Sequence, residues 1–228
     1  MQNIYWGINQ KKNNKRKLDE LYEFDDSDVY SRKLNDIKKS KLFNLGNKRI
    51  YVVGKEIHFT EKINDDTIEN IIRKITKIIN EHNKDYEGGD EKLEITYIVD
   101  SPGGSISSIL KFVDYIKLAK KKYPYLEFIS IITGTCASAG TIMCIIADKR
   151  YATEHSVQML HELSSGNSGK YTFMKSYTEH LTALHNTLIN IYLHRCKKTR
   201  NELEDILSNE TWFNAKEYLE AGFIDEIV

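Results

Sequence analysis

From Arg49 to the end of the chain, two kinds of apolar pattern alternate, and this alternation constrains the fold more than any other feature. Runs of consecutive apolar residues are typical of buried strands, and they lie at 49–54, 93–99, 128–133, 150–152, 157–160 and 223–228. Segments with apolar residues three and four apart predict helices. The first runs from the Asn64 cap through Ile79, and the second from Ser105 to the break at Tyr123-Pro124-Tyr125. Four more are predicted over 138–147, 171–197, 201–207 and 215–221, and Gly222 ends the last of them. Strands that alternate with helices pair mostly in parallel, with the helices as crossovers. We therefore expect an α/β domain over residues 48–228.

Residues 1–47 lack this order. A basic run at 11–17 is followed by an acidic run at 25–28, and the apolar residues show no sustained period. This composition predicts a flexible, charged N-terminal arm with a short helix near 18–24. The basic run could contact nucleic acid or a partner protein, although such a run is more commonly a solvated surface.

The composition narrows the class of protein. The chain has 228 residues, and its 33 basic residues balance its 33 acidic ones, which argues against a protein dominated by affinity for nucleic acid. Cys136, Cys144 and Cys196 lack metal-site spacing and are an odd number for a disulfide framework, so we expect free thiols in a reducing compartment. No apolar stretch has the length of a membrane span or resembles a signal-peptide core. We expect a cytoplasmic protein, or one in another reducing intracellular or viral-assembly compartment, with no nucleic-acid or membrane partner.

Ser138 is the first candidate for chemistry. It lies among small residues, in Thr133-Gly-Thr-Cys-Ala-Ser-Ala-Gly-Thr141, where a strand-like run meets a helix-like run. Small neighbours let a substrate approach, and the N–H of Ala139 at the helix start is a natural oxyanion donor. Taken alone, a serine in this position is more often a helix cap.

Two further features favour a catalytic serine. His161 follows the apolar run 157–160 and precedes a glycine-rich loop at 164–169, so it can face a cleft and act as the base that a serine nucleophile needs. Asp100-Ser-Pro-Gly-Gly104 ends another strand-like run and can aim backbone N–H groups at an oxyanion, although it could also be an ordinary turn capped by Ser101 or Ser105. The other six histidines lie on helices, as His185 does, or among charged and polar neighbours, and are less suited.

Four motifs in order carry a resemblance to a known family: Ser101-Pro-Gly-Gly104, Gly134-x-x-Ala-Ser-x-Gly140, Met159-Leu-His161, and Trp212-Phe-x-Ala-x-Glu217 with the ending Gly222-Phe-Ile-Asp225. From about Arg49 to Val228 the chain resembles the proteolytic subunit of Clp protease. Phage head-maturation proteases of the same superfamily are similar too, particularly over 210–213. The resemblance implies a ClpP/crotonase-like fold of repeated β-β-α units, with the helix over 171–197 as a protruding handle.

The resemblance also implies an activity, that of a serine endopeptidase acting on unfolded or extended polypeptide. Ser138 matches the nucleophile, His161 the general base, and Gly104 and Ala139 the residues whose N–H groups form the oxyanion hole. Glu210 matches the third member of the triad, where the family usually has an aspartate, and Asn209 is adjacent to it. The strand edges that hold an extended substrate are matched by Ser105, Ile106, Leu163 and Ser164.

An assembly follows from the same resemblance. It implies a homo-oligomeric ring, a heptamer or double heptamer stacked through the handle, with a separate AAA+ unfoldase supplying any ATP dependence. Thr211 stands where many members have an arginine that ties rings together, and Leu163 stands where they have a proline. The chain has no Gly-x-x-x-x-Gly-Lys phosphate loop, and we expect no metal or nucleotide cofactor.

Two alternatives stay open on the sequence. An acyl-CoA hydratase or isomerase of the crotonase type shares the fold and a Gly-Gly oxyanion hole, but it needs no serine–histidine pair. A non-catalytic structural subunit of a mixed ring is consistent with Glu210 and with the missing arginine.

Overall fold

The computed structural model describes residues 49–85 and 91–228. The expected arm at 1–47, its short helix and the expected loop at 86–90 lie outside the described residues. The description below concerns the unit that begins at Lys48.

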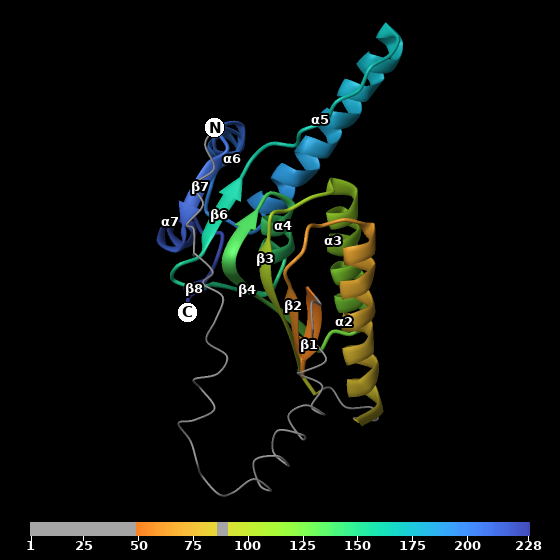
Figure 1. Cartoon of the computed structure of the whole chain (residues 1–228), viewed down its shortest axis with the longest axis vertical. Helices are drawn as coiled ribbons and strands as arrows, with labels where there is room; N and C mark the ends of the chain where they lie inside the picture. The colour runs from red at the N-terminus through yellow and green to blue at the C-terminus, as the bar shows by residue number, and fades with distance from the viewer. Residues whose placement is uncertain (1–48, 86–90) are drawn as a thin grey trace, which may run out of the picture. The chain divides into compact units, whose positions relative to one another are not determined.

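Eight strands form one sheet in the described part of the chain (Figure 1). The strands are β1 Ile50–Val53, β2 Glu56–Phe59, β3 Leu93–Ser101, β4 Leu126–Ala137, β5 Lys149–Ala152, β6 Val157–Leu160, β7 Thr211–Asn214 and β8 Glu226–Ile227. The main order is β1-β2-β3-β4-β5-β8, while β6 pairs with β4 and β7 pairs with β6. The β1–β2 and β6–β7 pairs are antiparallel and the other pairs are parallel. The mixed α/β architecture confirms the predicted fold class.

The helices are α2 Asp65–Asp85, α3 Ile106–Lys122, α4 Ala139–Ile145, α5 Tyr171–Leu193, α6 Arg200–Ser208 and α7 Ala215–Glu220. The expected cap of the first helix is present, since the Thr67 N–H donates to Oδ1 of Asn64 over 2.9 Å. Gly222 follows α7 with a φ of +79°, as expected of a residue that ends a helix. No helix among residues 49–85 and 91–228 is long and apolar enough to span a bilayer.

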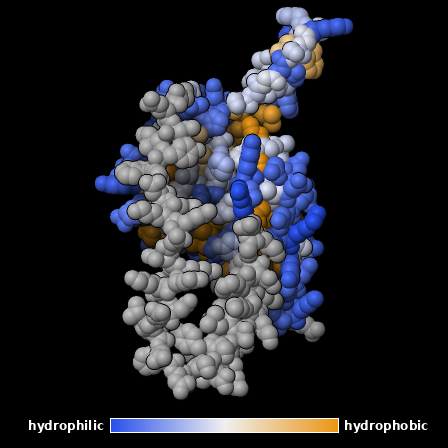
Figure 2. All heavy atoms as spheres, viewed as in Figure 1, coloured by the Kyte–Doolittle hydropathy of each residue, from blue (hydrophilic) through white to orange (hydrophobic). Residues whose placement is uncertain are grey.

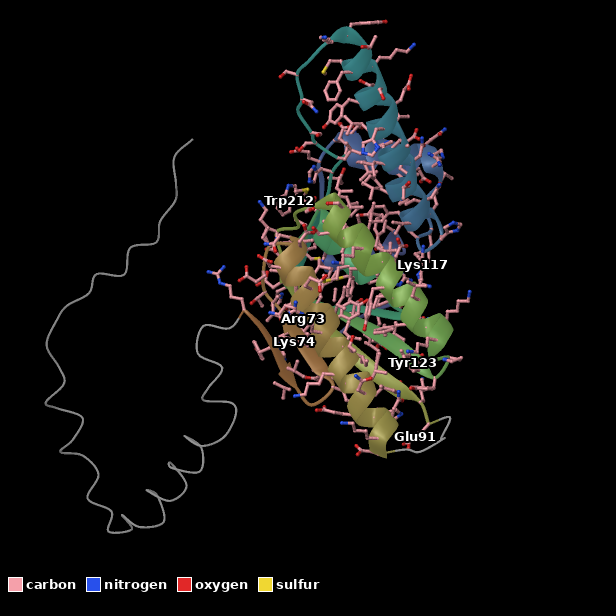
Figure 3. All side chains as sticks on the ribbon, turned by 90° about the vertical axis from the view of Figure 1, so that its right-hand side faces the viewer. Arg73, Lys74, Glu91, Lys117, Tyr123 and Trp212 are labelled. Atoms are coloured by element: carbon pink, nitrogen blue, oxygen red, sulfur yellow. The ribbon has the colours of Figure 1, made fainter. Side chains whose placement is uncertain are left out.

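Helices α2 and α3 lie side by side against the sheet (Figures 1 and 3). Each turns an apolar stripe inward: Ile68, Ile71, Ile75, Ile78 and Ile79 on α2 and Ile109, Phe112, Val113 and Ile116 on α3 are buried. Charged side chains cover the outer face, including Arg73 and Lys117 (Figure 3), and this side of the molecule is mostly hydrophilic in Figure 2.

The structure differs from the sequence prediction in two short strands and in several element boundaries. β8, for example, covers only 226–227 of the expected 223–228, and α2 continues beyond Ile79 to Asp85. The sequence analysis did not predict β2 and β7. Each has only four residues and a partly polar sequence, so it is pairing with neighbouring strands, rather than a local apolar pattern, that makes these segments strands. β4 is longer than expected at both ends. The long helix ends at Leu193 rather than at 197, where His194 takes the C-cap position.

The longer β4 is what brings the candidate site together. Its first half, Ile129 to Ile132, pairs with β5, and its second half, Thr135 to Ala137, pairs with β6. Between the halves the register against β3 shifts, from Val99 opposite Ile132 to Ser101 opposite Cys136. This irregularity lets one strand change neighbours, so β3, β4 and β6 end at the same edge of the sheet.

Candidate active site

Ser138 directly follows β4 at that edge, in an unusual backbone conformation. Its φ is 54° and its ψ is −126°, a region that side-chain-bearing residues rarely occupy. Its N–H donates to the Met159 carbonyl at the end of β6 over 2.8 Å. It occupies the N-cap position of α4, but its side chain makes no capping hydrogen bond. The helix-cap interpretation therefore does not explain this hydroxyl.

A hydrogen-bond network of Thr141 and Tyr192 supports the Ser138 turn. The N–H and hydroxyl of Thr141 both donate to the Ser138 carbonyl, over 3.0 Å and 2.7 Å. Because the Thr141 hydroxyl hydrogen is used in this way, the Tyr192 hydroxyl, 2.7 Å away, donates to Thr141 Oγ1. Burial raises the pKa of Tyr192, so it remains a neutral donor.

The Gly103-Gly104 turn packs directly against this serine. A methyl group on Gly103 would lie 2.5 Å from the Ala137 carbonyl oxygen and 2.7 Å from Cβ of Ser138. The turn is fixed by buried Ser101, whose hydroxyl donates to the Glu61 carbonyl over 2.7 Å and accepts from the Gly103 N–H over 3.2 Å. Only glycine allows the backbone to come this close to Ser138.

Gly104 is fixed by a backbone bridge to Ile63. The bridge consists of the Ile63 N–H donating to the Gly103 carbonyl over 2.8 Å and the Ser105 N–H donating to the Ile63 carbonyl over 2.9 Å. In a parallel bridge of this kind the N–H of the central residue, Gly104, points to the opposite side. Ser105 does cap a helix, because its Oγ accepts from the Ser108 N–H over 3.3 Å.

His161 directly follows β6 and lies near Ser138. Both residues are half-buried, and together they line two adjoining cavities. Within the described residues no hydrogen bond joins the two side chains. Such bonds are often long in an enzyme without substrate and shorten when substrate binds.

Glu210 lies one residue before β7, and His161 lies one residue after β6. The pairing of β6 with β7 ends with Leu160 opposite Thr211, and beyond it the Glu162 N–H donates to the Leu207 carbonyl over 2.9 Å. Glu210 is exposed and has a φ of 49°, and its side chain makes no hydrogen bond or ion pair within the described residues. The amide of Asn209 donates instead to the carbonyl and carboxylate of Asp205, over 2.8 Å and 3.1 Å.

A groove of about 710 Å³ runs past Ser138 and His161. All four residues matched to substrate binding line it: Ser105, Ile106, Leu163 and Ser164. They are not in strands, however, since Ser105 caps α3, Ile106 begins it, and the other two follow β6 in irregular chain. The α5 residues Tyr177, Leu181 and Leu184 also line it. Apolar side chains gather where α5 meets the rest of this unit (Figure 2).

A residue that the sequence interpretation set aside also lies here. His185 on α5 lines the smaller cavity beside Ser138 and His161. Its position could have been found from the helical period, because it lies four residues after Leu181 and three before Leu188, on the apolar stripe. The sequence did not show that this stripe borders the site.

A serine at a strained strand-to-helix turn, a histidine at the next strand end and a glycine turn at one sheet edge are the parts of a serine hydrolase. The family model described as Clp protease matches residues 47–228. The chain therefore belongs to the Clp protease family and is a serine-type peptidase.

Curated relatives agree with the family match. The ATP-dependent Clp protease proteolytic subunit 1 of Protochlamydia amoebophila is 28% identical over 179 residues, covering 77% of this chain and 81% of the relative. The subunit of the same name from Chlamydia abortus is 24% identical over 200 residues, covering 86% and 93%. The ATP-dependent Clp protease proteolytic subunit of Streptococcus sanguinis is 27% identical over 205 residues, covering 88% and 89%. The predicted resemblance is confirmed.

Proposed function

We propose that this chain is an endopeptidase in which Ser138 is the nucleophile and His161 the general base. His161 takes the Ser138 hydroxyl proton as the oxygen attacks a peptide carbonyl, and then gives the proton to the leaving amine. Water, activated by the same histidine, hydrolyses the acyl-enzyme. The observation that carries the proposal is the strained Ser138 turn, whose hydroxyl caps no helix and lies in the same cavities as His161.

The oxyanion would be held by the N–H groups of Gly104 and Ala139. The Ile63 bridge leaves the Gly104 N–H pointing away from its partner strand. The Ala139 N–H is at the start of α4, where intrahelical acceptors are lacking. Two amides from different elements, fixed before substrate arrives, lower the cost of developing negative charge.

Glu210 is our candidate for the third member. A carboxylate next to His161 would orient the imidazole and stabilise its protonated form. The pairing of β6 with β7 supports this role because it ends at Leu160 and Thr211, the chain neighbours of His161 and Glu210. The side chain would have to turn toward His161, since it makes no such contact in this structure.

The substrate is proposed to be unfolded or extended polypeptide, bound along the groove and held by Ser105, Ile106, Leu163 and Ser164. The assembly is proposed to be a homo-oligomeric ring, a heptamer or a pair of stacked heptamers. The relatives' names include "ATP-dependent", and a separate AAA+ unfoldase would supply that dependence here. We place this activity in the cytoplasm or another reducing compartment.

Hydrolysis of a dye-labelled, permanently unfolded polypeptide tests the function. The wild-type chain should release labelled peptides, and Ser138→Ala and His161→Ala should each lower the rate by at least about 10²-fold. Ser176→Ala, an exposed serine on α5, is the matched control and should leave the rate unchanged. Equal rates in Ser138→Ala and wild type would contradict the proposal.

A non-catalytic ring subunit is the second candidate, and the missing Ser138–His161 hydrogen bond is the observation that favours it. That candidate predicts no hydrolysis by the assembled wild-type chain. The acyl-CoA alternative has no comparable support, because the family match is to proteases.

A further inference from the structure

The Ser138 carbonyl and the Ala139 N–H belong to one peptide unit, so the groups that hold the carbonyl also aim the amide. Every peptide bond in the described residues is trans, and in a trans unit the C=O and the following N–H point in opposite directions. The Thr141 N–H and hydroxyl both donate to this carbonyl, over 3.0 Å and 2.7 Å. The Ala139 N–H therefore points away from Thr141, which is itself fully buried.

Thr141 is held in turn by a side chain from another helix. Tyr192, near the end of α5, donates its hydroxyl hydrogen to Thr141 Oγ1 over 2.7 Å, and only 3% of this residue is exposed. A hydroxyl hydrogen rotates to suit its partners, and the bond from Tyr192 leaves the Thr141 hydrogen directed at the Ser138 carbonyl. Hydrogen bonds in such a chain strengthen one another where water is excluded. Tyr192 thus acts on the peptide unit through Thr141.

We propose that Thr141 and Tyr192 are positioning residues for the oxyanion hole, because by fixing the Ser138–Ala139 peptide unit they keep the Ala139 N–H aimed at the oxyanion. This inference rests on the proposed function. The backbone of Ser138, with a φ of 54° and a ψ of −126°, is of a kind that persists only where its surroundings hold it. A change in that ψ would turn the amide away, and an oxyanion donor acts fully only if it is oriented before the reaction.

A second buried tyrosine shows that packing alone does not require the Tyr192 hydroxyl. Tyr218 on α7 is 1% exposed, and its hydroxyl makes no hydrogen bond within the described residues. Both tyrosine rings contact Phe223, with ring centroids 6.1 Å away for Tyr192 and 4.9 Å away for Tyr218. The two residues share burial and a neighbour, and only Tyr192 is linked to the serine turn. Tyr218 is therefore the matched control.

Hydrolysis of a fluorogenic peptide, with kcat and KM measured separately, tests the inference. Thr141→Val removes one of the two bonds to the Ser138 carbonyl and should lower kcat about tenfold with KM unchanged, since the oxyanion forms only as the reaction proceeds. Tyr192→Phe acts through Thr141 and should lower kcat less, by about threefold. Thr141→Ser keeps the hydroxyl and should keep the wild-type kcat. Tyr218→Phe should leave both constants unchanged.

The double variant Thr141→Val/Tyr192→Phe separates positioning from stability. Thr141→Val alone leaves the Tyr192 hydroxyl buried without its acceptor, and the second substitution removes that hydroxyl, so the double variant should melt at a higher temperature than Thr141→Val. If the two residues act as one relay, its kcat should nevertheless equal that of Thr141→Val. A kcat that recovers together with the melting temperature would overturn the inference, because the two residues would then serve stability alone.

Two further results would overturn it: a wild-type kcat in folded Thr141→Val and Tyr192→Phe, or an equal loss of kcat in Tyr218→Phe. Should Thr141→Val fail to fold, Tyr192→Phe measured against Tyr218→Phe decides, and equal kcat values in these two would count against the relay. Failure of the proposed function looks different, since the wild type would then neither cleave the peptide nor react with a fluorophosphonate.

Discussion

Ser138, the proposed nucleophile, has a backbone conformation that costs stability. At φ 54° and ψ −126° its Cβ is sterically strained, and glycine would not be. We predict that Ser138→Gly increases the free energy of unfolding by about 1 kcal/mol relative to Ser138→Ala, which keeps the Cβ. Denaturant unfolding of the two variants measures this difference. A glycine variant less stable than the alanine variant would show that the turn is not strained.

For individual residues, the sequence predicted which residues the structure brings together at the candidate site, but not what surrounds each of them. The motifs located Ser138, His161 and the glycine turn, because small residues at strand ends leave a visible pattern. They could not show that the Ser138 hydroxyl caps nothing, since the pattern of a capping serine is the same. His185 was set aside because a helical stripe does not reveal what it faces.

Among the structural elements, the Gly103-Gly104 turn depends on a close approach between its own backbone and that of Ile63. A methyl group on Gly104 would lie 2.1 Å from the Ile63 carbonyl oxygen, and the φ of 151° is unfavourable for alanine. We predict that Gly104→Ala breaks the Ile63 bridge and lowers kcat/KM by about 10²-fold or more, as loss of an oxyanion donor does. Gly166→Ala is the matched control, because a methyl group there would meet open space. Equal peptidase rates for the two variants would contradict this account of the turn.

The hydroxyl group of Ser101 stabilises that turn through two hydrogen bonds. Ser101→Ala removes a buried hydroxyl that serves the Glu61 carbonyl and the Gly103 N–H. We expect a loss of about 1–3 kcal/mol in the free energy of unfolding, because two buried backbone groups lose a partner. Thermal unfolding measures the loss, and a change below about 0.5 kcal/mol would mean that the turn holds without it.

Elements were predictable where local pattern decides them. The apolar run at 157–160 coincides with β6, and the isoleucine period predicted α2. β2 and β7 were missed because four residues cannot show a period and their pairing partners are distant in sequence. The change of neighbours along β4 was also missed, since only the assembled sheet shows it.

For the whole molecule, an ion-pair network links the starts of the central parallel strands. Lys92 and Lys149 lie 2.7 Å and 2.8 Å from Oε2 of Glu127. Hydrogen bonds from Lys149 and Lys92 lower the pKa of Glu127 from 4.5 to about 2. In the unfolded chain this carboxyl takes up its proton near its ordinary value, so its stabilising contribution is present above about pH 4.5 and is lost as the pH falls to about 2. Glu127→Gln should flatten the decline of unfolding free energy over this range, and an identical slope in the variant would contradict the assignment.

Helix α5, the expected handle, has exposed aromatic residues at its start that could form a contact between rings. Tyr171 and Phe173 at the start of α5 are 80% and 48% exposed, and α5 projects beyond the sheet in Figure 1. If rings stack through this helix, replacing both residues by serine should halve the mass of the particle in solution. Light scattering coupled to size-exclusion chromatography measures this, and an unchanged mass would argue against stacking through the aromatic tip.

The most direct test of the central claim is where a fluorophosphonate attaches to the wild-type chain. Intact mass and peptide mapping should show one adduct per chain, on Ser138, formed slowly or not at all in His161→Ala. An adduct on another serine, or no adduct on an assembled and folded protein, would contradict the assignment of Ser138 as the nucleophile.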